Sequence, residues 1–389
     1  MVDIAERLLI CPPMPDDSDE PVQRPSERPG TYQEQRILVL HNADFGEISD
    51  GDPSFESRAD VVNQAHDVSR ALVTRGHFVD VMGIDRGDLP DLLERLREDP
   101  PDLVFNLVES LAQVDQNAMA VTALLELFDV PFTGPGTLSV GICCNKQRTK
   151  QILKAEGLPT PRWGVVDGQF RSRIADLTAV AGVGYPAIVK LLAEDGSLGI
   201  SSSSVVYDDD ALARQLRVMR EQFPGRKLLV EQFIDGRELY VALLGDRVLP
   251  VTEIDLSALP AGQPRIVTYD GKWTKGSVDY LNTPSSRLAT GLSLSQTERL
   301  QSVARNSFAA LAVCDYGRVD LRLASDGTPY VLEVNPNCDL SDGAGLSNSA
   351  RAASIPYDQM IDAIAVSARE RFADELPVKR RTNSGDSGQ

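Results

Sequence analysis

Hydrophobic and polar residues follow a pattern that predicts alternating strands and helices in the first part of the chain. Apolar residues recur at helical spacing from Val61 to Val73, and Gly76 ends this predicted helix. A second helix is expected at residues 88–98, before Pro100 and Pro101. Short apolar runs, typical of buried strands, lie around these helices: RILVLH (36–41), HFVDVMGI (77–84) and DLVFNLV (102–108). This alternation indicates a parallel sheet with helices on its faces.

A second alternation follows two further predicted helices, at residues 116–128 and 146–156. It comprises strands at 184–190, 204–209 and 227–234, with a helix at 211–223. Beyond it the pattern predicts an antiparallel meander at 237–255 that turns at Gly245-Asp246, followed by a long irregular loop at 261–290. Two further helices are expected, at 293–313, capped by Ser293 or Ser295, and at 356–372.

Near the end of the chain, two alternating segments flank an Asp-Gly pair. The segments are GRVDLRLA (317–324) and PYVLEVN (329–335), and Asp-Gly between such runs predicts a β-hairpin. If Asp326 and Gly327 are the two central residues of the turn, Asp320 lies opposite Glu333, and Arg318 lies opposite Asn335. Side chains alternate along a strand, so all four share one face.

Such a hairpin would hold two carboxylates about 5 Å apart, measured between their Cβ atoms. Burying the pair of Asp320 and Glu333 without neutralisation is costly, so a divalent cation is the natural third partner. Oxygen ligands suit Mg²⁺, or Mn²⁺, bound together with substrate phosphates. The alternative is an ordinary solvated strand face.

Candidate nucleotide contacts precede the hairpin. Lys190 ends a predicted strand, and the loop that follows carries Gly196 and Gly199, whose bare amides suit phosphate oxygens. Glu231 ends another strand and Glu238 begins the next, where they could accept from an adenine amino group and a ribose hydroxyl. The alternatives are a plain surface loop and two solvated glutamates.

Taken in order, these motifs resemble the ATP-grasp superfamily and, within it, the D-alanine–D-alanine ligase-like carboxylate–amine ligases. The resemblance runs from about residue 36 to residue 372. Its most specific pieces are VPFTGPG…NKQRTKQILKAEGLPTP, YPAIVK…EDGSLGIS, EQFIDGRELYVALL and GRVDLRLASDGTPYVLEVNPN. The resemblance depends on the occurrence of the whole set in this order.

The resemblance implies an ATP-grasp fold of mixed α/β and α+β class, with a parallel-sheet domain followed by two α+β lobes that enclose the nucleotide. The expected divisions are a flexible extension (1–35), an N-terminal domain (36–142), a small lobe (143–235), a large lobe with the metal site (236–372) and a flexible tail (373–389).

Roles carry over to matching positions. The resemblance implies that Lys146 and Lys190 contact the nucleotide phosphates, that Gly196, Ser197, Leu198 and Gly199 form a flexible phosphate-covering loop, and that Glu231 with the backbone of Phe233 and Ile234 binds adenine. It also implies that Glu238 is the ribose ligand and that the Mg²⁺ ligands are Asp320, Glu333 and Asn335. Arg318 is then the residue that stabilises the transferred phosphoryl group, and Lys272 is the basic residue of a closing loop.

The reaction implied forms an acyl phosphate from a carboxylate and ATP, which an amine then attacks. Mg²⁺, lysine and arginine would neutralise the transferring phosphoryl group, and closure of residues 261–290 would exclude water. Alternatives are a phosphotransferase or thiol ligase with the same nucleotide cleft, or a nucleotide-binding regulator without catalysis.

The substrate-binding half departs from the D-alanine–D-alanine ligases. Where those enzymes carry a His-Gly pair, this chain has Glu109-Ser110. The glycine-rich loop with its glutamate has no match in residues 41–57 (HNADFGEISDGDPSFES). A short Ser/Gly segment is replaced by PNCDLSDGAGLS. The D-alanine dipeptide is therefore not the expected product, and amino acids or small peptides are. Candidate substrate contacts, each with a structural role as the alternative, are His41, Glu109, Ser110, Asp339 and Ser341.

Composition and net charge limit the partners and the cellular location that we expect. The net charge of −18 argues against nucleic acid and anionic membranes as partners, and apolar runs are too short for a membrane span. Five cysteines without paired spacing and an acidic N-terminal segment fit a cytoplasmic protein. The expected partners are a carboxylate and an amine as small-molecule substrates, and the resemblance allows a homodimer.

Overall fold

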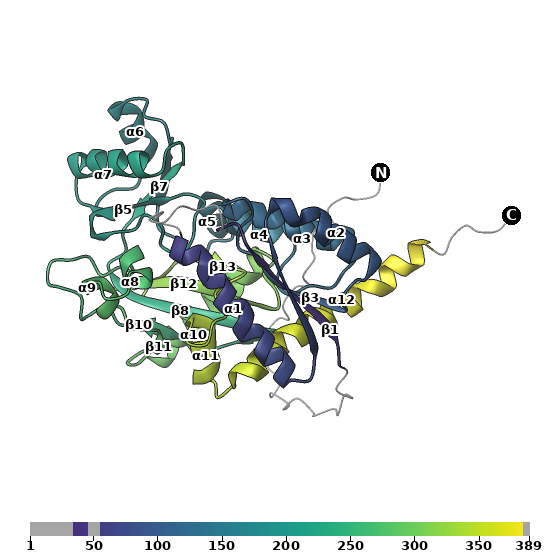
Figure 1. The fold of residues 1–389 in the computed structure, drawn as a ribbon. Coiled ribbons are helices and arrows are strands. Elements are labelled where there is room, and N and C mark those ends of the chain that lie inside the picture. The colour runs from purple at the N-terminus through teal and green to yellow at the C-terminus, as the bar shows by residue number, and fades with distance from the viewer. Residues whose placement is uncertain (1–33, 46–54, 384–389) are drawn as a thin grey trace.

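A computed structural model describes residues 34–45 and 55–383 of the chain, with side chains described except at 55–59 and 374–383. Most of the predicted extension (1–35) and the end of the predicted tail lie outside these residues, as does the middle of segment 41–57. The described chain forms three parts, each built on its own β-sheet (Figure 1).

The N-terminal domain contains the predicted parallel sheet. Its strands are β1 (Arg36–Asn42), β2 (Phe78–Ile84) and β3 (Leu103–Leu107), in the order β2-β1-β3. The helices α1 (Phe55–Thr74), α2 (Leu89–Glu98) and α3 (Ala118–Leu127) cover it. Ile37 and Val39 pack into one apolar core, whereas Leu38 and Leu40 pack into another. The continuous apolar run of β1 thus reflects burial on both faces of the sheet.

The small lobe is built on an antiparallel sheet in the order β4-β7-β5-β6. Its strands are β4 (Trp163–Val166), β5 (Ala187–Leu191), β6 (Val205–Val206) and β7 (Leu228–Gln232). The helices α6 (Arg173–Val180) and α7 (Asp209–Gln222) pack into one apolar core with it. Strand β4 and helix α6 were not predicted from the sequence.

The large lobe is built on a sheet in the order β11-β10-β8-β12-β13, with β9 paired to β8. The strands are β8 (Gly236–Leu244), β9 (Arg247–Val248), β10 (Thr252–Ile254), β11 (Arg287–Leu288), β12 (Tyr316–Ala324) and β13 (Pro329–Asn335). Helix α10 (Leu294–Ala310) covers one face, and α11 (Gly345–Ala352), which was not predicted, covers the other. Ser293 caps α10 by accepting from Gln296, which decides between the two predicted caps.

Shorter elements connect these parts. Helices α4 (Thr137–Cys143) and α5 (Lys146–Ala155) follow the N-terminal domain, and Leu153 of α5 packs into the core of the large lobe. Residues 261–290, predicted as irregular, contain α8 (Tyr269–Trp273), α9 (Val278–Leu281) and β11. The described residues also contain the 3-10 turns η2 (Arg86–Asp88), η3 (Asp115–Asn117) and η4 (Ser202–Ser204).

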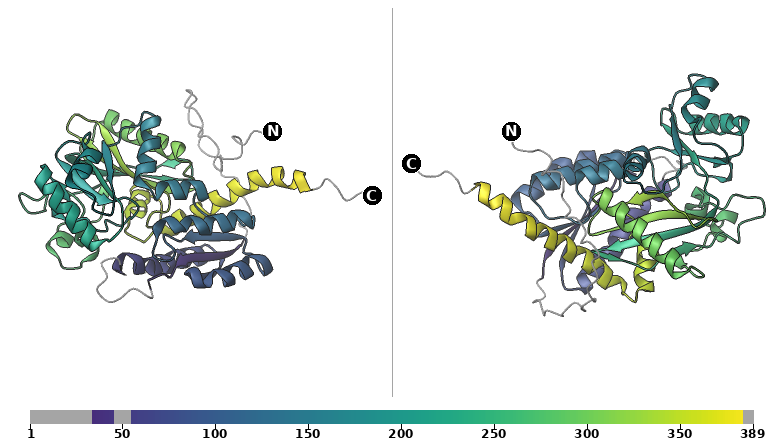
Figure 2. Two further views of the ribbon diagram at one scale, coloured as in Figure 1. Left: turned by 90° about the horizontal axis from the view of Figure 1, so that it is seen from above. Right: turned by 180° about the vertical axis from the view of Figure 1, so that it is seen from behind.

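The last helix, α12 (Tyr357–Asn383), is longer than predicted. The predicted boundary at residue 372 falls inside it, and three of the next four residues, Ala373, Glu375 and Leu376, are good helix formers. Figure 2 shows α12 reaching from the large lobe across the N-terminal domain, where it packs against α1 and β3.

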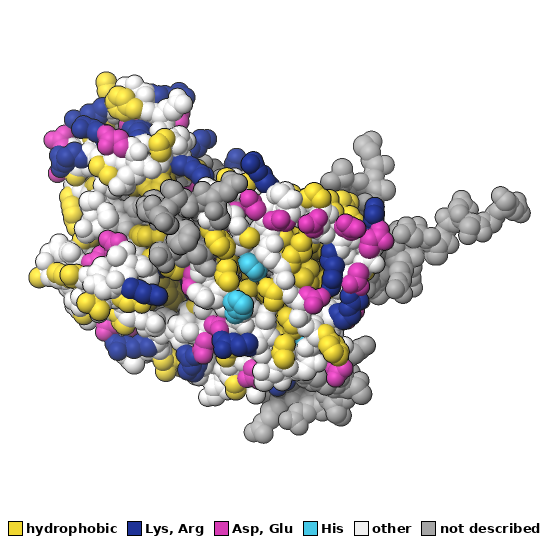
Figure 3. Space-filling model, viewed as in Figure 1, with side chains coloured by type: hydrophobic (Ala, Val, Ile, Leu, Met, Phe, Trp, Pro, Cys, Tyr) yellow, Lys and Arg dark blue, Asp and Glu magenta, His cyan; other side chains and the backbone are white. Residues whose placement is uncertain are grey.

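Charged side chains of both signs are interspersed over the face drawn in Figure 3, on the small lobe and on the rest of the molecule. No helix within the described residues has the length and apolar character needed to cross a membrane.

Candidate active site

The predicted hairpin is present, and its central pairing is confirmed. Asp320 of β12 faces Glu333 of β13, and Arg318 faces Asn335. These residues therefore meet on one face of the large-lobe sheet, as their alternation along the strands requires.

The turn itself differs from the prediction. Gly327 donates to the carbonyl of Ala324 (2.9 Å) and has a φ of +80°, and Ala324 donates to the carbonyl of Thr328 (3.0 Å). Three residues, not two, therefore form the loop. A bulge on β13 at Leu332 then shifts the register between Asp320 and Leu321, which restores the predicted pair.

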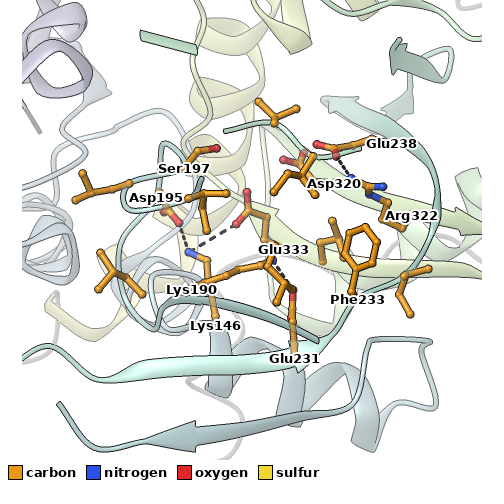
Figure 4. A pocket seen from close by; sticks show the side chains of 18 of the residues that line it. Lys146, Lys190, Asp195, Ser197, Glu231, Phe233, Glu238, Asp320, Arg322 and Glu333 are labelled. Atoms are coloured by element: carbon orange, nitrogen blue, oxygen red, sulfur yellow. Dashed lines mark hydrogen bonds and ion pairs between the residues drawn. The ribbon is translucent and has the colours of Figure 1, made fainter. Parts of the chain in front are cut away.

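A cavity lies between the small-lobe sheet and this hairpin (Figure 4). Many of the residues predicted to bind the nucleotide or the metal line it: Lys146, Lys190, Ser197, Leu198, Glu231, Phe233, Ile234, Glu238, Lys272, Asp320 and Glu333. Residues more than a hundred positions apart in sequence are thus brought to one site.

The two carboxylates of the hairpin differ in their electrostatic surroundings. Burial raises the pKa of Asp320 to about 6, although Arg318 opposes this by donating to both carboxylate oxygens (2.6 and 2.9 Å). Burial also acts on Glu333, but the charges of Lys146 and Lys190 outweigh it and lower the pKa of Glu333 to about 2. Glu333 is therefore ionised at neutral pH.

A divalent cation fits the donor atoms at this position. Asp320, Glu333 and Asn335 share one face and together offer only oxygen ligands to a cation. The side-chain nitrogen of Asn335 is buried and has no hydrogen-bond partner among the described residues, so it can still donate to a bound acceptor. No cluster of three or more His, Cys, Asp or Glu side chains that could hold a metal occurs among the described residues, so Asp320 and Glu333 are not part of such a cluster.

Lys146 occupies the first turn of α5, where Asn145 caps the helix by accepting from Arg148. Its Nζ donates to the carbonyl of Glu194 and to Asp195 Oδ1, both at 2.6 Å, and lies 3.6 Å from Glu333 Oε2. Burial opposes its charge, but Asp195 and Glu333 raise the pKa of Lys146 above its usual range. The cation is therefore permanent and lies beside the hairpin carboxylates.

Glu231 is the centre of a buried ion cluster. It is 1% exposed, and its two oxygens pair with Lys190 and with Lys150, the latter at 2.8 Å. Lys150 was missed by the sequence reasoning. Its position one helical turn after Lys146, on the same side of α5, was the available signal.

Two further residues missed from the sequence are Arg322 and Tyr240. Arg322 donates to Glu238 Oε2 (2.6 Å) and to the carbonyl of Gly236 (3.0 Å), so the predicted ribose ligand is held in place. The guanidinium of Arg318 lies 4.6 Å from the ring centre of Tyr240. The alternation that placed Arg318 and Asp320 on the site face also places Arg322 there.

The predicted phosphate-covering loop is shaped by positive φ angles at Gly196, Ser197 and Gly199. Trp273 of α8 donates its indole N–H to the carbonyl of Gly196 (2.9 Å), and Tyr269 N donates to the carbonyl of Ile200. The loop carrying Lys272 therefore rests directly on the phosphate-covering loop.

The predicted substrate residues lie outside the cavity lining. Glu109 accepts from Gln64 (3.3 Å), which in turn accepts from the backbone N–H of Leu340 (2.8 Å). Desolvation and the charge of Asp339 raise the pKa of Glu109, although its side chain keeps access to solvent. This chain of contacts joins the segment after β3 to the segment after the hairpin.

The remaining substrate candidates have partners of differing kinds. Ser110 is buried and donates to Asp44 (2.7 Å), and buried His41 contacts the carbonyl of Asn42 through Nδ1. Asp339 accepts from the backbone N–H of Ser341, whose buried hydroxyl has no hydrogen-bond partner among the described residues.

Known proteins resemble this chain over most of its length. Residues 152–366, more than half of the chain, match the family model described as D-ala D-ala ligase C-terminus. The D-alanine–D-alanine ligase of Aromatoleum aromaticum is 33% identical over 252 residues, which are 64% of this chain and 74% of the relative. The chain belongs to the D-alanine–D-alanine ligase family. It is thus an ATP-grasp ligase.

Other known proteins also match this chain over about two thirds of its length or more. An uncharacterised protein of Sinorhizobium fredii, y4sG, is 31% identical over 69% of this chain and 75% of its own length. The D-alanine–D-alanine ligase of Bacillus anthracis, solved in complex with ATP, superposes with a TM-score of 0.68 at 23% identity, covering 88% of this chain and 99% of that structure. That of Coxiella burnetii has a TM-score of 0.64 at 18% identity, over 90% and 99%. The ligase fold therefore extends beyond residues 152–366.

Proposed function

We propose that this ligase joins a substrate carboxylate to an amine and forms ADP, through an acyl phosphate. The observation that carries the proposal is the pairing of Asp320 with Glu333 beside Lys146, in a cavity that Lys190 also lines. Paired carboxylates beside lysine side chains suit the binding of a metal–nucleotide complex and the transfer of its terminal phosphoryl group.

In this reaction, the cavity residues predicted from the sequence and their neighbours on the hairpin have distinct roles. Lys146 and Lys190 bind nucleotide phosphates, Phe233 and Ile234 border the base, and Glu238, held by Arg322, accepts from the ribose. A metal ion, Mg²⁺ or Mn²⁺, held by Asp320, Glu333 and Asn335, would neutralise phosphate charge when bound. Arg318, the neighbour of Asp320 on β12, stabilises the transferred group.

The acyl phosphate must be protected from water until the amine attacks. The hydrogen bond from Trp273 to Gly196 supports a covering role for residues 261–290, since it joins this segment to the phosphate-covering loop. Lys272, one residue before Trp273, lines the cavity from this cover and contributes charge at the reacting end.

We further propose that the substrates are amino acids or small peptides other than two D-alanines. Glu109-Ser110 gives this region a carboxylate where the ligases of the cell-wall type carry His-Gly. Glu109 is linked through Gln64 to the segment of Asp339 and Ser341, so the first-substrate and second-substrate regions are coupled here. Glu109 would hold a substrate amine, and the free hydroxyl of Ser341 would contact the acceptor.

The experiment is a screen for phosphate release with ATP and Mg²⁺ across pairs of amino acids and dipeptides, including two D-alanines. The expected result is phosphate release that requires both partners, with an amide product confirmed by mass. Phosphate transferred to a stable product would favour a phosphotransferase, and turnover with D-alanine alone would overturn the substrate assignment. The homodimer that the resemblance allows stays a prediction, which the mass in solution tests.

A further inference from the structure

Lys150 is a completely buried cation that does not line the cavity. The residue is 0% exposed, and it lies one helical turn after Lys146, which does line the cavity. Burying an ammonium group is costly unless partners compensate it. The contacts of Lys150 Nζ show how the charge of this lysine is compensated.

The first partner is Glu231, which is buried as deeply as Lys150. Lys150 Nζ lies 2.8 Å from Glu231 Oε2, whereas Lys190 pairs with Oε1 of the same carboxylate. Burial alone would raise the pKa of Glu231, but the two lysines outweigh it and lower that pKa. Glu231 thus remains an anion in a place where solvent cannot stabilise it.

The second partner connects Lys150 to the metal-binding hairpin. Lys150 Nζ donates to Thr160 Oγ1 (3.0 Å), and this hydroxyl donates to the carbonyl of Val331 (2.9 Å). Val331 lies directly before the bulge at Leu332, two residues from Glu333, and its N–H donates to Pro159. Lys150 therefore contacts Glu231 on one side and, through Thr160, the strand that carries Glu333 on the other.

Glu231, unlike Lys150, reaches the cavity, beside Phe233 and Ile234. An ionised carboxylate can only accept hydrogen bonds. At the position of a purine base it favours an amino group, which donates, and repels a 6-oxo group, which accepts. A carboxylate that rotated away or became protonated would lose this preference.

We propose that Lys150 is a positioning residue that enforces selection of 6-amino over 6-oxo purine nucleotides, by holding Glu231 charged and oriented toward the base. The proposal rests on the function proposed above, since it requires the nucleotide to occupy this cavity. It assigns a specificity role to a side chain that touches neither base nor phosphate.

The test compares binding of ATP and of GTP, each with Mg²⁺, by calorimetry. Variants are Lys150→Met, Glu231→Gln and the double variant, with Lys154→Met as the matched control because Lys154 is exposed on the same helix, over Trp163. The preference of wild type for ATP over GTP should fall about tenfold or more in K150M, as expected for a lost charge-assisted hydrogen bond. K154M should keep the wild-type preference.

A structural role alone predicts a different result. If Lys150 acts through Glu231, K150M causes no further loss in the E231Q background; equal losses in both backgrounds overturn the proposal. So does a K150M protein that is folded and keeps the wild-type ratio. Should K150M not fold, K150Q, which keeps an N–H donor without the charge, must show the same loss. Wild type that binds neither nucleotide contradicts the proposed function instead.

Discussion

Trp273 donates its indole N–H to the carbonyl oxygen of Gly196 at 2.9 Å, and this bond joins two loops that come from different lobes. Gly196 belongs to the small-lobe loop that is predicted to cover the phosphates, and Trp273 ends the short helix that carries Lys272. The two segments proposed to cover the cavity are therefore connected. They are expected to open and close together.

Replacing Trp273 by Phe removes this bond but keeps an aromatic side chain. We expect KM for ATP to rise about threefold to tenfold, the effect of one neutral hydrogen bond, and the share of ATP hydrolysed without amide formation to increase. Steady-state assays of phosphate and amide measure both quantities. W163F, which alters the only other tryptophan, is the control and should leave both unchanged.

Asp320→Asn should lower turnover by about a hundredfold or more, while ATP binding changes much less, because the charge is needed mainly as the phosphoryl group transfers. Asp326→Asn, at the exposed tip of the same hairpin, is the matched control and should retain activity. Single-turnover assays and calorimetry separate the two effects. Unchanged turnover in D320N would show that the metal assignment is wrong.

Metal binding should depend on pH through Asp320, whose pKa burial raises to about 6. A ligand must lose its proton, so Mg²⁺ affinity should fall as pH drops through about 6, with release approaching one proton per ion near pH 5 and none near pH 8. In metal-free protein, the raised pKa of Asp320 means that the folded state holds its proton more tightly than the unfolded chain. The free energy of unfolding therefore falls as pH rises from about 4 to about 6.

Calorimetry in two buffers with different ionisation enthalpies counts the released protons. In D320N this release should disappear. An affinity for Mg²⁺ that stays constant between about pH 5 and pH 8 would contradict the role of Asp320 as the titrating ligand.

Gly345→Ala should disturb Arg318 without unfolding the protein. A Cβ at Gly345 would lie 3.0 Å from Cδ and 3.1 Å from Nη1 of Arg318, whose guanidinium is held by Asp320 and by the ring of Tyr240. We expect kcat to fall about tenfold through misplacement of the guanidinium, with a small change in melting temperature. G182A, where a Cβ would meet nothing within 4 Å, is the control.

The sequence predicted the central pair of the site because strand alternation and a turn signal are local properties. The pairing of Asp320 with Glu333 was right although the turn was one residue longer than expected, since the bulge at Leu332 compensates. A bulge has no reliable sequence signal of its own, so this detail required the structure. Helix α11 was missed because glycine and serine dominate its neighbourhood.

Lys150 and Arg322 could not be recognised in the same way. Their roles depend on partners that lie about eighty residues away, Glu231 and Glu238, which tertiary folding brings to them. A lysine or an arginine in an amphipathic helix or strand is normally solvated, and burial is the property that sets these two apart. Burial of a single charged residue is decided by the packing of other elements.

Helix α12 affects the order in which parts of the chain can fold during synthesis. Met360, Ile361 and Ile364 complete an apolar core whose other members include Ile37 and Phe105 of the N-terminal sheet. The N-terminal sheet therefore cannot complete this core until residues 360–364 have emerged. Its apolar side chains stay partly exposed while the two lobes between them are synthesised, which makes this sheet dependent on protection from aggregation.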